Sequence, residues 1–210
     1  GKHRSKRVTR WNQNGINLLI NNEPASFARA YAELHGASVC AVGIKVDDVD
    51  AATQRAQALQ IRGFSQPIGP GELRIPAARG VGESLMYFIR KGEEQHVWKN
   101  DFVSVAEPAR HASTVGLLRI DHLTQTMQYE AMLSWLLYYL SLFTVAKTEQ
   151  VEIEDPFGLV YSQAVESSDR AFRMVLNSSS ADQTLSSRFL HGFMGAGVQH
   201  INAFAAHESA

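Results

Sequence analysis

The segment Arg119-Ile120-Asp121-His122-Leu123 has a counterpart in Gly197-Val198-Gln199-His200-Ile201. Both segments belong to apolar runs of strand character that follow a glycine or small-residue break, and their histidines are 78 positions apart (200 minus 122). A third such run extends from Val39 to Val46, so predicted strands begin at intervals of roughly 80 residues. This period predicts repeated modules, in which equivalent residues occupy equivalent points in space.

Each module is predicted to begin with a strand, which is followed by a helix and then by further strands. In the first module a helix capped by Asp47 or Asp48 runs until Gly63, and short strands follow at 72–75 and 84–89. The second module has a strand at 117–123, a helix whose apolar face lies within 132–143, and strands at 145–153, 158–165 and 171–177. The sequence therefore predicts an α+β fold built from repeated βαβββ modules.

The remaining elements flank these two modules. Asn14-Gly15 favours a tight hairpin turn between paired strands within residues 7–21, and a helix is predicted from Pro24 to Gly36. Near the other end, serines 178–180 are predicted to cap a last helix, and a strand is predicted to begin at Val198. A linker is predicted at 106–116, which divides the chain into an amino-terminal half, 1–105, and a carboxyl-terminal half, 117–210.

Composition limits the classes of function. The formal net charge is -1 and charged residues make up 20% of the chain, so no nucleic-acid partner is expected. The longest apolar stretch, Met132 to Val145, is too short to span a bilayer, and no membrane partner is expected. The single cysteine, Cys40, forms no internal disulfide, which fits a reducing, cytoplasmic location.

The chemistry of the repeat centres on His122 and His200. Each lies in the middle of its module's first strand, and two such histidines brought together by a sheet can hold one side of a metal site with open positions. The usual third ligand is a carboxylate. Glu208 is the only carboxylate downstream of His200, but it is predicted to point away from the site, so we expect the third ligand outside this chain. The alternative is that both histidines are ordinary core or edge residues.

Several runs together resemble 4-hydroxyphenylpyruvate dioxygenase, a member of the vicinal oxygen chelate superfamily with a glyoxalase-like fold. The matching runs cover most of the chain and comprise 3–6 with 14–17, 36–46, 72–77, 120–123 and 195–201. In that family the histidines that match His122 and His200 bind iron(II), and a glutamate on a late strand completes the triad. The resemblance also implies that the fold is incomplete at both ends of this chain.

The family's substrate pocket gives further expectations. Ser162 matches a pocket serine, and Asn177 matches a pocket asparagine, so both are expected to bind substrate. A pocket glutamine expected on the helix before the second histidine has no match in Leu185-Ser186-Ser187-Arg188-Phe189. With this departure, and over the run from His3 to Asn21, the sequence resembles the dioxygenase-like carboxyl-terminal domain of bacterial two-domain 3-dehydroshikimate dehydratases.

The resemblance implies a function and leaves alternatives. In those dehydratases an amino-terminal barrel with its own metal converts 3-dehydroshikimate to protocatechuate and water, so this chain would be the barrel's metal-binding companion domain, part of a lyase. The alternatives are an iron(II) dioxygenase of the 4-hydroxyphenylpyruvate type and a non-catalytic structural or dimerisation module. The expected partners are a small-molecule substrate, the barrel domain and a second copy in a homo-oligomer. A divalent metal is expected, iron(II) in a dioxygenase, with magnesium, manganese or cobalt also suited.

Overall fold

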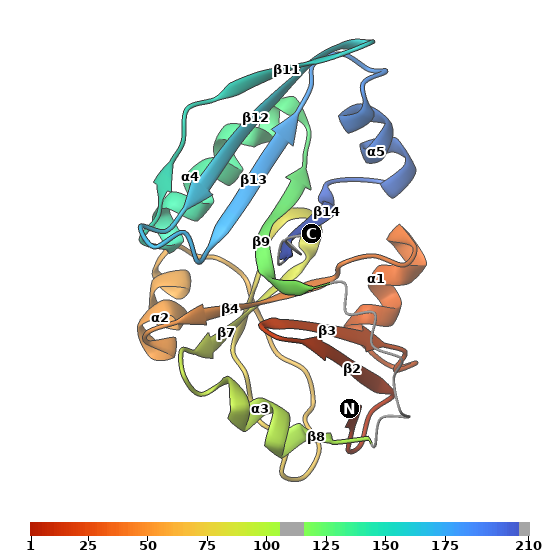
Figure 1. Cartoon of the computed structure of the whole chain (residues 1–210), viewed down its shortest axis with the longest axis vertical. Helices are drawn as coiled ribbons and strands as arrows, with labels where there is room; N and C mark the ends of the chain where they lie inside the picture. Colours follow the sequence, from red (N-terminus) through yellow and green to blue (C-terminus); the bar gives the residue numbers. More distant parts are fainter. Residues whose placement is uncertain (106–115, 206–210) are drawn as a thin grey trace, which may run out of the picture.

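The computed structural model describes residues 1–105 and 116–205. The predicted linker, apart from Gly116, and the Glu208 side chain lie outside these residues. Figure 1 shows the two halves of the chain one above the other, with the carboxyl-terminal half uppermost. The predicted α+β class is confirmed, with three sheets and helices between and beside them.

The amino-terminal half begins with the predicted hairpin. β2 (Val8–Gln13) and β3 (Ile16–Asn21) pair around Asn14-Gly15, and Asn14 takes a φ of 47°. With β1 (Lys2–His3) and β8 (Phe102–Val103) they form a sheet of order β3-β2-β1-β8. The predicted helix is α1 (Phe27–His35), which starts after its cap Ser26 and ends at Gly36 with a φ of 73°.

The first complete module has the predicted order of strand, helix and three strands. β4 (Ala41–Val46) leads to α2 (Val49–Ala58), whose first turn is capped by the Asp48 carboxylate, and the chain continues through β5 (Gly63–Phe64), β6 (Ala77–Arg79), the short helix η1 (Val81–Glu83) and β7 (Leu85–Arg90). These strands form a second sheet of order β4-β7-β6-β5.

Three features of this half differ from prediction. The helix expected to run until Gly63 ends at Ala58, and Gly63 begins β5. Residues 72–75 form no strand, because the Glu72 carboxylate accepts hydrogen bonds from Ser5, from Lys6 Nζ at 2.6 Å and from the Gly69 amide at 2.7 Å. These contacts hold the segment against the amino-terminal residues. The next strand along the chain is β6, which begins at Ala77. The sequence also did not reveal α3 (Glu94–Asp101), whose Trp98 packs between Phe102 and the Arg10 guanidinium.

The carboxyl-terminal half repeats the module in a third sheet. β9 (Leu117–Thr126) is followed by η2 (Tyr129–Ala131) and α4 (Met132–Leu142), and then by β10 (Ala146–Lys147), β11 (Val151–Asp155), β12 (Gly158–Glu166) and β13 (Arg173–Ser178). The strand order is β10-β12-β13-β9-β14, with β11 also paired to β12. The last elements are α5 (Leu185–Phe193) and β14 (Gly197–Ala205).

Two details of this half differ from prediction. The strand expected at 145–153 is divided into β10 and β11, and between them the Thr148 hydroxyl accepts a hydrogen bond from the Ala164 amide at 3.1 Å. The last helix is capped by Thr184 and not by the serines at 178–180. Ser178 instead ends β13, and Ser179 donates a hydrogen bond to the Leu159 carbonyl at 2.6 Å.

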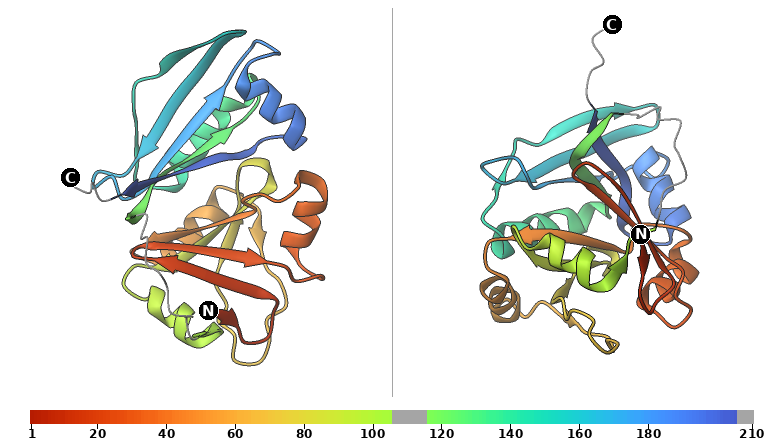
Figure 2. Two further views of the ribbon diagram at one scale, coloured as in Figure 1. Left: turned by 45° about the vertical axis from the view of Figure 1, so that its right-hand side comes forward. Right: turned by 60° about the horizontal axis from the view of Figure 1, so that its bottom comes forward.

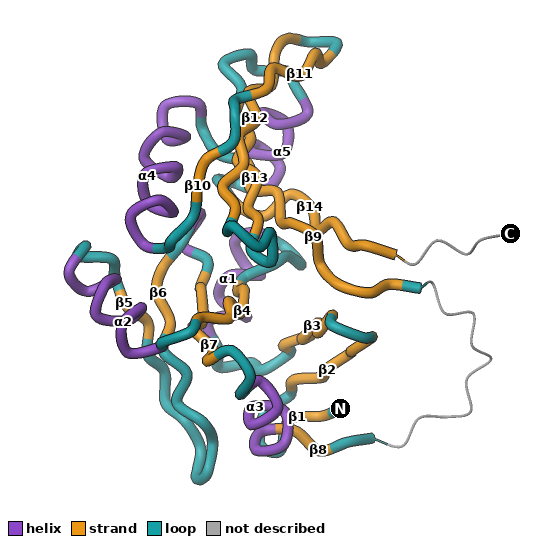
Figure 3. Tube along the Cα trace, turned by 60° about the vertical axis from the view of Figure 1, so that its left-hand side comes forward, coloured by secondary structure: helices purple, strands orange, loops and turns teal. Residues whose placement is uncertain are grey.

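One hydrophobic core joins the two halves. Ile44 and Phe88 of the second sheet belong to the same buried cluster as Tyr139 and Leu142 of α4. Figures 2 and 3 show α4 lying against the third sheet and above α2. Polar contacts cross the same boundary, since Tyr138 donates a hydrogen bond to the Arg79 carbonyl at 2.7 Å.

A glycine lies at one close contact between the halves. Gly82 has a φ of +62°, and a Cβ atom placed on it would lie 1.8 Å from the carbonyl oxygen of Ala196. Ala196 directly precedes β14, the strand that carries His200. The amino-terminal half therefore contacts the chain just before this strand.

In the part of the chain that the structure describes, the helices are too short to cross a bilayer.

Candidate metal centre

The two predicted ligands lie on neighbouring antiparallel strands. β14 pairs with β9 so that His200 is opposite Thr124 and Asn202 is opposite His122. Directly opposite residues share a face of the sheet, and so do residues two apart on one strand. His122, Thr124, His200 and Asn202 therefore share one face, and the other face of the sheet packs on α4.

The histidine rings lie close to each other. Their centroids are 6.3 Å apart and their planes make an angle of 71°. With metal–nitrogen bonds of about 2.1 Å, the centres of two imidazoles in adjacent coordination positions lie about 5 Å apart. A side-chain rotation that brings the rings about 1 Å closer would let both bind one ion. The side chain of His200 has room for this rotation because the residue is exposed.

The charges around His122 favour a cation. Asp121 Oδ2 is 2.6 Å from His122 Nδ1 and 3.7 Å from Arg173 Nη1, and Glu166 Oε2 is 3.1 Å from Arg173 Nε. Two carboxylates and one guanidinium give this group a net charge of -1. Although His200 is exposed overall, its ring is partly desolvated, and this desolvation, followed by the positive charge of a protonated His122, lowers the pKa of His200, which favours the neutral imidazole that binds metals.

The donor set that the described residues offer at this site is two imidazoles. Within residues 1–105 and 116–205, no three side chains of histidine, cysteine, aspartate or glutamate lie close enough to hold a metal together. The histidine pair fits one side of a site with two imidazole ligands and one carboxylate. The carboxylate is not supplied by the described residues.

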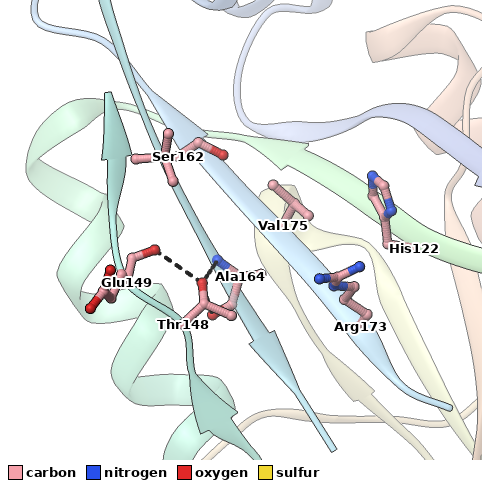
Figure 4. A pocket seen from close by; sticks show the side chains of 8 residues that line it. His122, Thr148, Glu149, Ser162, Ala164, Arg173 and Val175 are labelled. Carbon is pink, nitrogen blue, oxygen red and sulfur yellow. Dashed lines mark hydrogen bonds between the residues drawn. The ribbon is translucent and has the colours of Figure 1, made fainter. Parts of the chain in front are cut away.

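A pocket opens beside His122 on the same face. Its volume is about 560 Å³, and its walls include His122, Thr148, Ser162, Arg173 and Val175. Figure 4 shows Arg173 on the same side of the sheet as His122, with Ser162 and Thr148 across the pocket. The walls combine polar groups with the apolar side chains of Val151, Ala164 and Val175, a lining suited to a small polar molecule with an apolar part.

The predicted substrate residues lie on this face. Ser162 and Asn177 are directly opposite on β12 and β13, and Ser162 lines the pocket. Asn177 is not among the pocket-lining residues, but its Oδ1 is buried and has no hydrogen-bond partner among the described residues. The hydroxyl of Thr124, which lies opposite His200, is also buried without a hydrogen-bond partner among the described residues, and Thr124 is 1% exposed. Buried polar atoms without partners are rare, so these two are candidate contacts for a ligand.

Sequence reasoning missed three residues of this site: Asp121, Arg173 and Asn202. Asp121 and Asn202 are sequence neighbours of the histidines, which is a weak signal for a role in the site. Arg173 lies 51 positions after His122 (173 minus 122), and only the parallel pairing of β13 with β9 brings the two together.

The chain is similar to known dioxygenases and dehydratases. Residues 1–103 match the family model described as "Hydroxyphenylpyruvate dioxygenase, HPPD, N-terminal". A 3-dehydroshikimate dehydratase of Pseudomonas putida is 39% identical, over 96% of this chain and 31% of that protein. A 4-hydroxyphenylpyruvate dioxygenase of Pseudomonas sp. (strain P.J. 874) is 36% identical, over 95% of this chain and 56% of that protein. The chain thus spans about a third to a half of the length of these relatives.

Two solved structures support the fold. A "xylose isomerase-like TIM barrel/4-hydroxyphenylpyruvate dioxygenase fusion protein" matches with a TM-score of 0.76 and 36% identity, over 99% of this chain and 32% of that one. A variant of 4-hydroxymandelate synthase from Streptomyces coelicolor matches with a TM-score of 0.75 and 18% identity, over 93% of this chain and 57% of that one, which shows the fold alone. The chain is therefore a 4-hydroxyphenylpyruvate dioxygenase-like domain with a glyoxalase-type fold, and its residues 1–103 match the family model for the amino-terminal part of those dioxygenases.

Proposed function

We propose that this chain is the metal-binding, dioxygenase-like domain of a longer 3-dehydroshikimate dehydratase, in which a barrel domain dehydrates 3-dehydroshikimate to protocatechuate. Two relatives with that name, from Pseudomonas putida and Pseudomonas aeruginosa, are each 39% identical to nearly the whole chain. The chain covers 31% of each, which leaves room for a barrel domain of the kind named in the fusion protein.

The observation that carries the metal part of the proposal is the shared face of His122 and His200, with ring centroids 6.3 Å apart. His122 and His200 would hold a divalent ion, and a carboxylate outside the described residues would complete the set. When bound, such an ion supplies Lewis-acid chemistry to an oxygen-rich ligand. Ser162 and Asn177 would orient that ligand, because both lie on the same face of the sheet as the histidines.

The test is elemental analysis of the full-length protein beside a double variant, His122→Ala with His200→Ala. We expect the wild type to hold one more equivalent of divalent metal than the double variant. His191→Ala is the matched control, since His191 is exposed on α5, and it should hold as much metal as the wild type. Equal metal content in the double variant and the wild type would refute the metal site.

The same proteins are assayed with 3-dehydroshikimate. Dehydration that persists in the double variant supports a companion role for this domain, and dehydration that disappears in a correctly folded double variant places the chemistry here. Full-length wild type without any dehydratase activity would refute the dehydratase assignment.

A second candidate is an iron(II) dioxygenase that acts on a 2-oxo acid. Two observations favour it: the 36% identity to a 4-hydroxyphenylpyruvate dioxygenase, and the position of Ser162 on the wall of the pocket beside His122. Oxygen consumption with 4-hydroxyphenylpyruvate, dependent on iron(II) and lost in the double variant, would support this candidate over the first.

A further inference from the structure

The two candidate ligands differ in how they are held. His122 is in contact at both ring nitrogens, with Asp121 Oδ2 2.6 Å from Nδ1 and Asn202 Nδ2 2.6 Å from Nε2. The ring of His200 has no hydrogen-bond partner among the described residues, although its chain position in the repeat is equivalent. His122 is therefore oriented before any metal arrives, and His200 is free to adjust.

An irregularity in the sheet explains how Asp121 reaches its neighbour. Adjacent residues of a regular strand point to opposite faces. Between β9 and β14, however, the pairing passes from Asn202 opposite His122 to Ala203 opposite Ile120, so Asp121 is an extra residue with no partner. A bulge of this kind re-aims a side chain. It allows the Asp121 carboxylate to lie beside the His122 ring.

The contacts determine where the proton of the neutral ring lies. An ionised carboxylate only accepts hydrogen bonds, so His122 Nδ1 carries the proton and donates it to Asp121. Nε2 is then an acceptor, and the Asn202 amide donates to it. Asp121 is itself 3.7 Å from the Arg173 guanidinium, which is also paired with Glu166, and both carboxylate side chains are about 20% exposed.

We propose that Asp121 is the positioning residue of His122, fixing the ring with Nε2 unprotonated and aimed across the shared face, and that Asn202 caps Nε2 until a metal displaces it. The proposal deepens the proposed function, because it concerns the loading of the same site. An ion about 2.1 Å from Nε2 would fall almost on the Asn202 amide nitrogen, which is 2.6 Å away, so the two cannot coexist. Metal loading is thus an exchange with Asn202.

The first experiment needs no metal. The ring nitrogens of His122 are observed by ¹⁵N NMR in the metal-free full-length protein with labelled histidine. We expect the proton on Nδ1 in the wild type and in Asp121→Glu, which restores the carboxylate. Asp121→Ala should lose this preference and shift toward the proton on Nε2. Glu149→Gln removes a pocket charge that has no contact with His122, and it should leave the His122 signals unchanged.

The second experiment measures Co²⁺ and Zn²⁺ affinity by calorimetry. Loss of a carboxylate that supports a ligating histidine costs roughly 10–100-fold in metal affinity, which we expect for Asp121→Ala. Asn202→Ala should bind metal about fivefold more tightly, because one hydrogen bond of about 1 kcal/mol no longer competes.

The outcomes separate this inference from the proposed function. A wild-type His122 with its proton on Nε2, or an Asp121→Ala variant with unchanged signals, overturns the role of Asp121. Weaker metal binding by Asn202→Ala would indicate that Asn202 is a ligand, and unchanged binding would indicate that it does not compete with the metal. Either result would overturn the proposal that Asn202 caps His122 Nε2. If the wild type binds no divalent metal, the proposed metal site fails, while the NMR measurement still decides how His122 is positioned.

Discussion

A methyl group at residue 82 would test how tightly the two halves of the chain are joined. Gly82 has a φ of +62°, and its added Cβ would lie 1.8 Å from the Ala196 carbonyl oxygen. The left-handed backbone costs a non-glycine residue about 1–2 kcal/mol. Relieving the contact requires the backbones to separate by more than about 1 Å, an overpacking that costs about 1–3 kcal/mol more. We therefore expect Gly82→Ala to lower the free energy of unfolding by about 2–5 kcal/mol.

A second glycine isolates the steric part of this loss. Gly92 has a φ of +86°, but an added Cβ there has no atom within 4 Å, so Gly92→Ala bears only the backbone cost. Urea denaturation of both variants should show Gly82→Ala less stable than Gly92→Ala by about 1–3 kcal/mol, or about 2–4 °C in Tm for each kcal/mol. Because Ala196 precedes β14, Gly82→Ala should also weaken metal binding at His200. Equal stability of the two variants, within about 0.5 kcal/mol, would refute the close contact.

Three further variants test local features of the fold. Burial raises the pKa of Glu72, but hydrogen bonds from Lys6, Ser5 and the Gly69 amide, with the Lys6 charge, outweigh it and lower the pKa from 4.5 to about 2. Glu72 therefore stabilises the fold above pH 4.5 and loses this effect as the pH falls toward 2. After allowance for solvent screening, Glu72→Gln should cost about 1–2 kcal/mol at pH 7 and little once the pH falls below 2, and a pH-independent difference in urea denaturation would contradict this. Tyr139→Phe removes the 2.7 Å hydrogen bond to buried Gln125 and should cost about 1–3 kcal/mol by the same assay, whereas a loss below about 0.5 kcal/mol would show that the bond contributes little. Asp48→Ala removes the cap of α2 and should cost about 1 kcal/mol, and Asp48→Asn, which keeps a capping oxygen, should restore most of it.

The sequence predicted those parts of the fold that depend on local patterns. Asn14-Gly15 gave the hairpin because few residue pairs tolerate its backbone angles, and the apolar face of residues 132–143 gave α4 because one stripe of that helix must be buried. The spacing of His122 and His200 predicted that each lies on the first strand of a module and that both lie on one face of a sheet. The family resemblance, and not the spacing, supplied Ser162 and Asn177.

The errors arose where distant contacts outweigh local preference. Glu72 is drawn from a strand-like run by Ser5 and Lys6, more than 60 positions earlier in the chain. Thr184 caps α5 in place of the serines at 178–180, because β13 continues to Ser178. The role of Asp121 depends on a bulge defined only by the register of β14 against β9. A single sequence carries no signal for such a register.

The core that runs from the second sheet through α4 has a consequence for any attempt to divide the molecule. Ile44 and Phe88 belong to the same cluster as Tyr139 and Leu142, so part of the apolar surface of each half is buried against the other. We therefore expect polypeptides 1–105 and 117–210 produced apart to present that surface to water and to associate or aggregate, and we expect the intact chain to unfold in one cooperative step. A substitution that destabilises one half should therefore lower the free energy of unfolding of the whole chain.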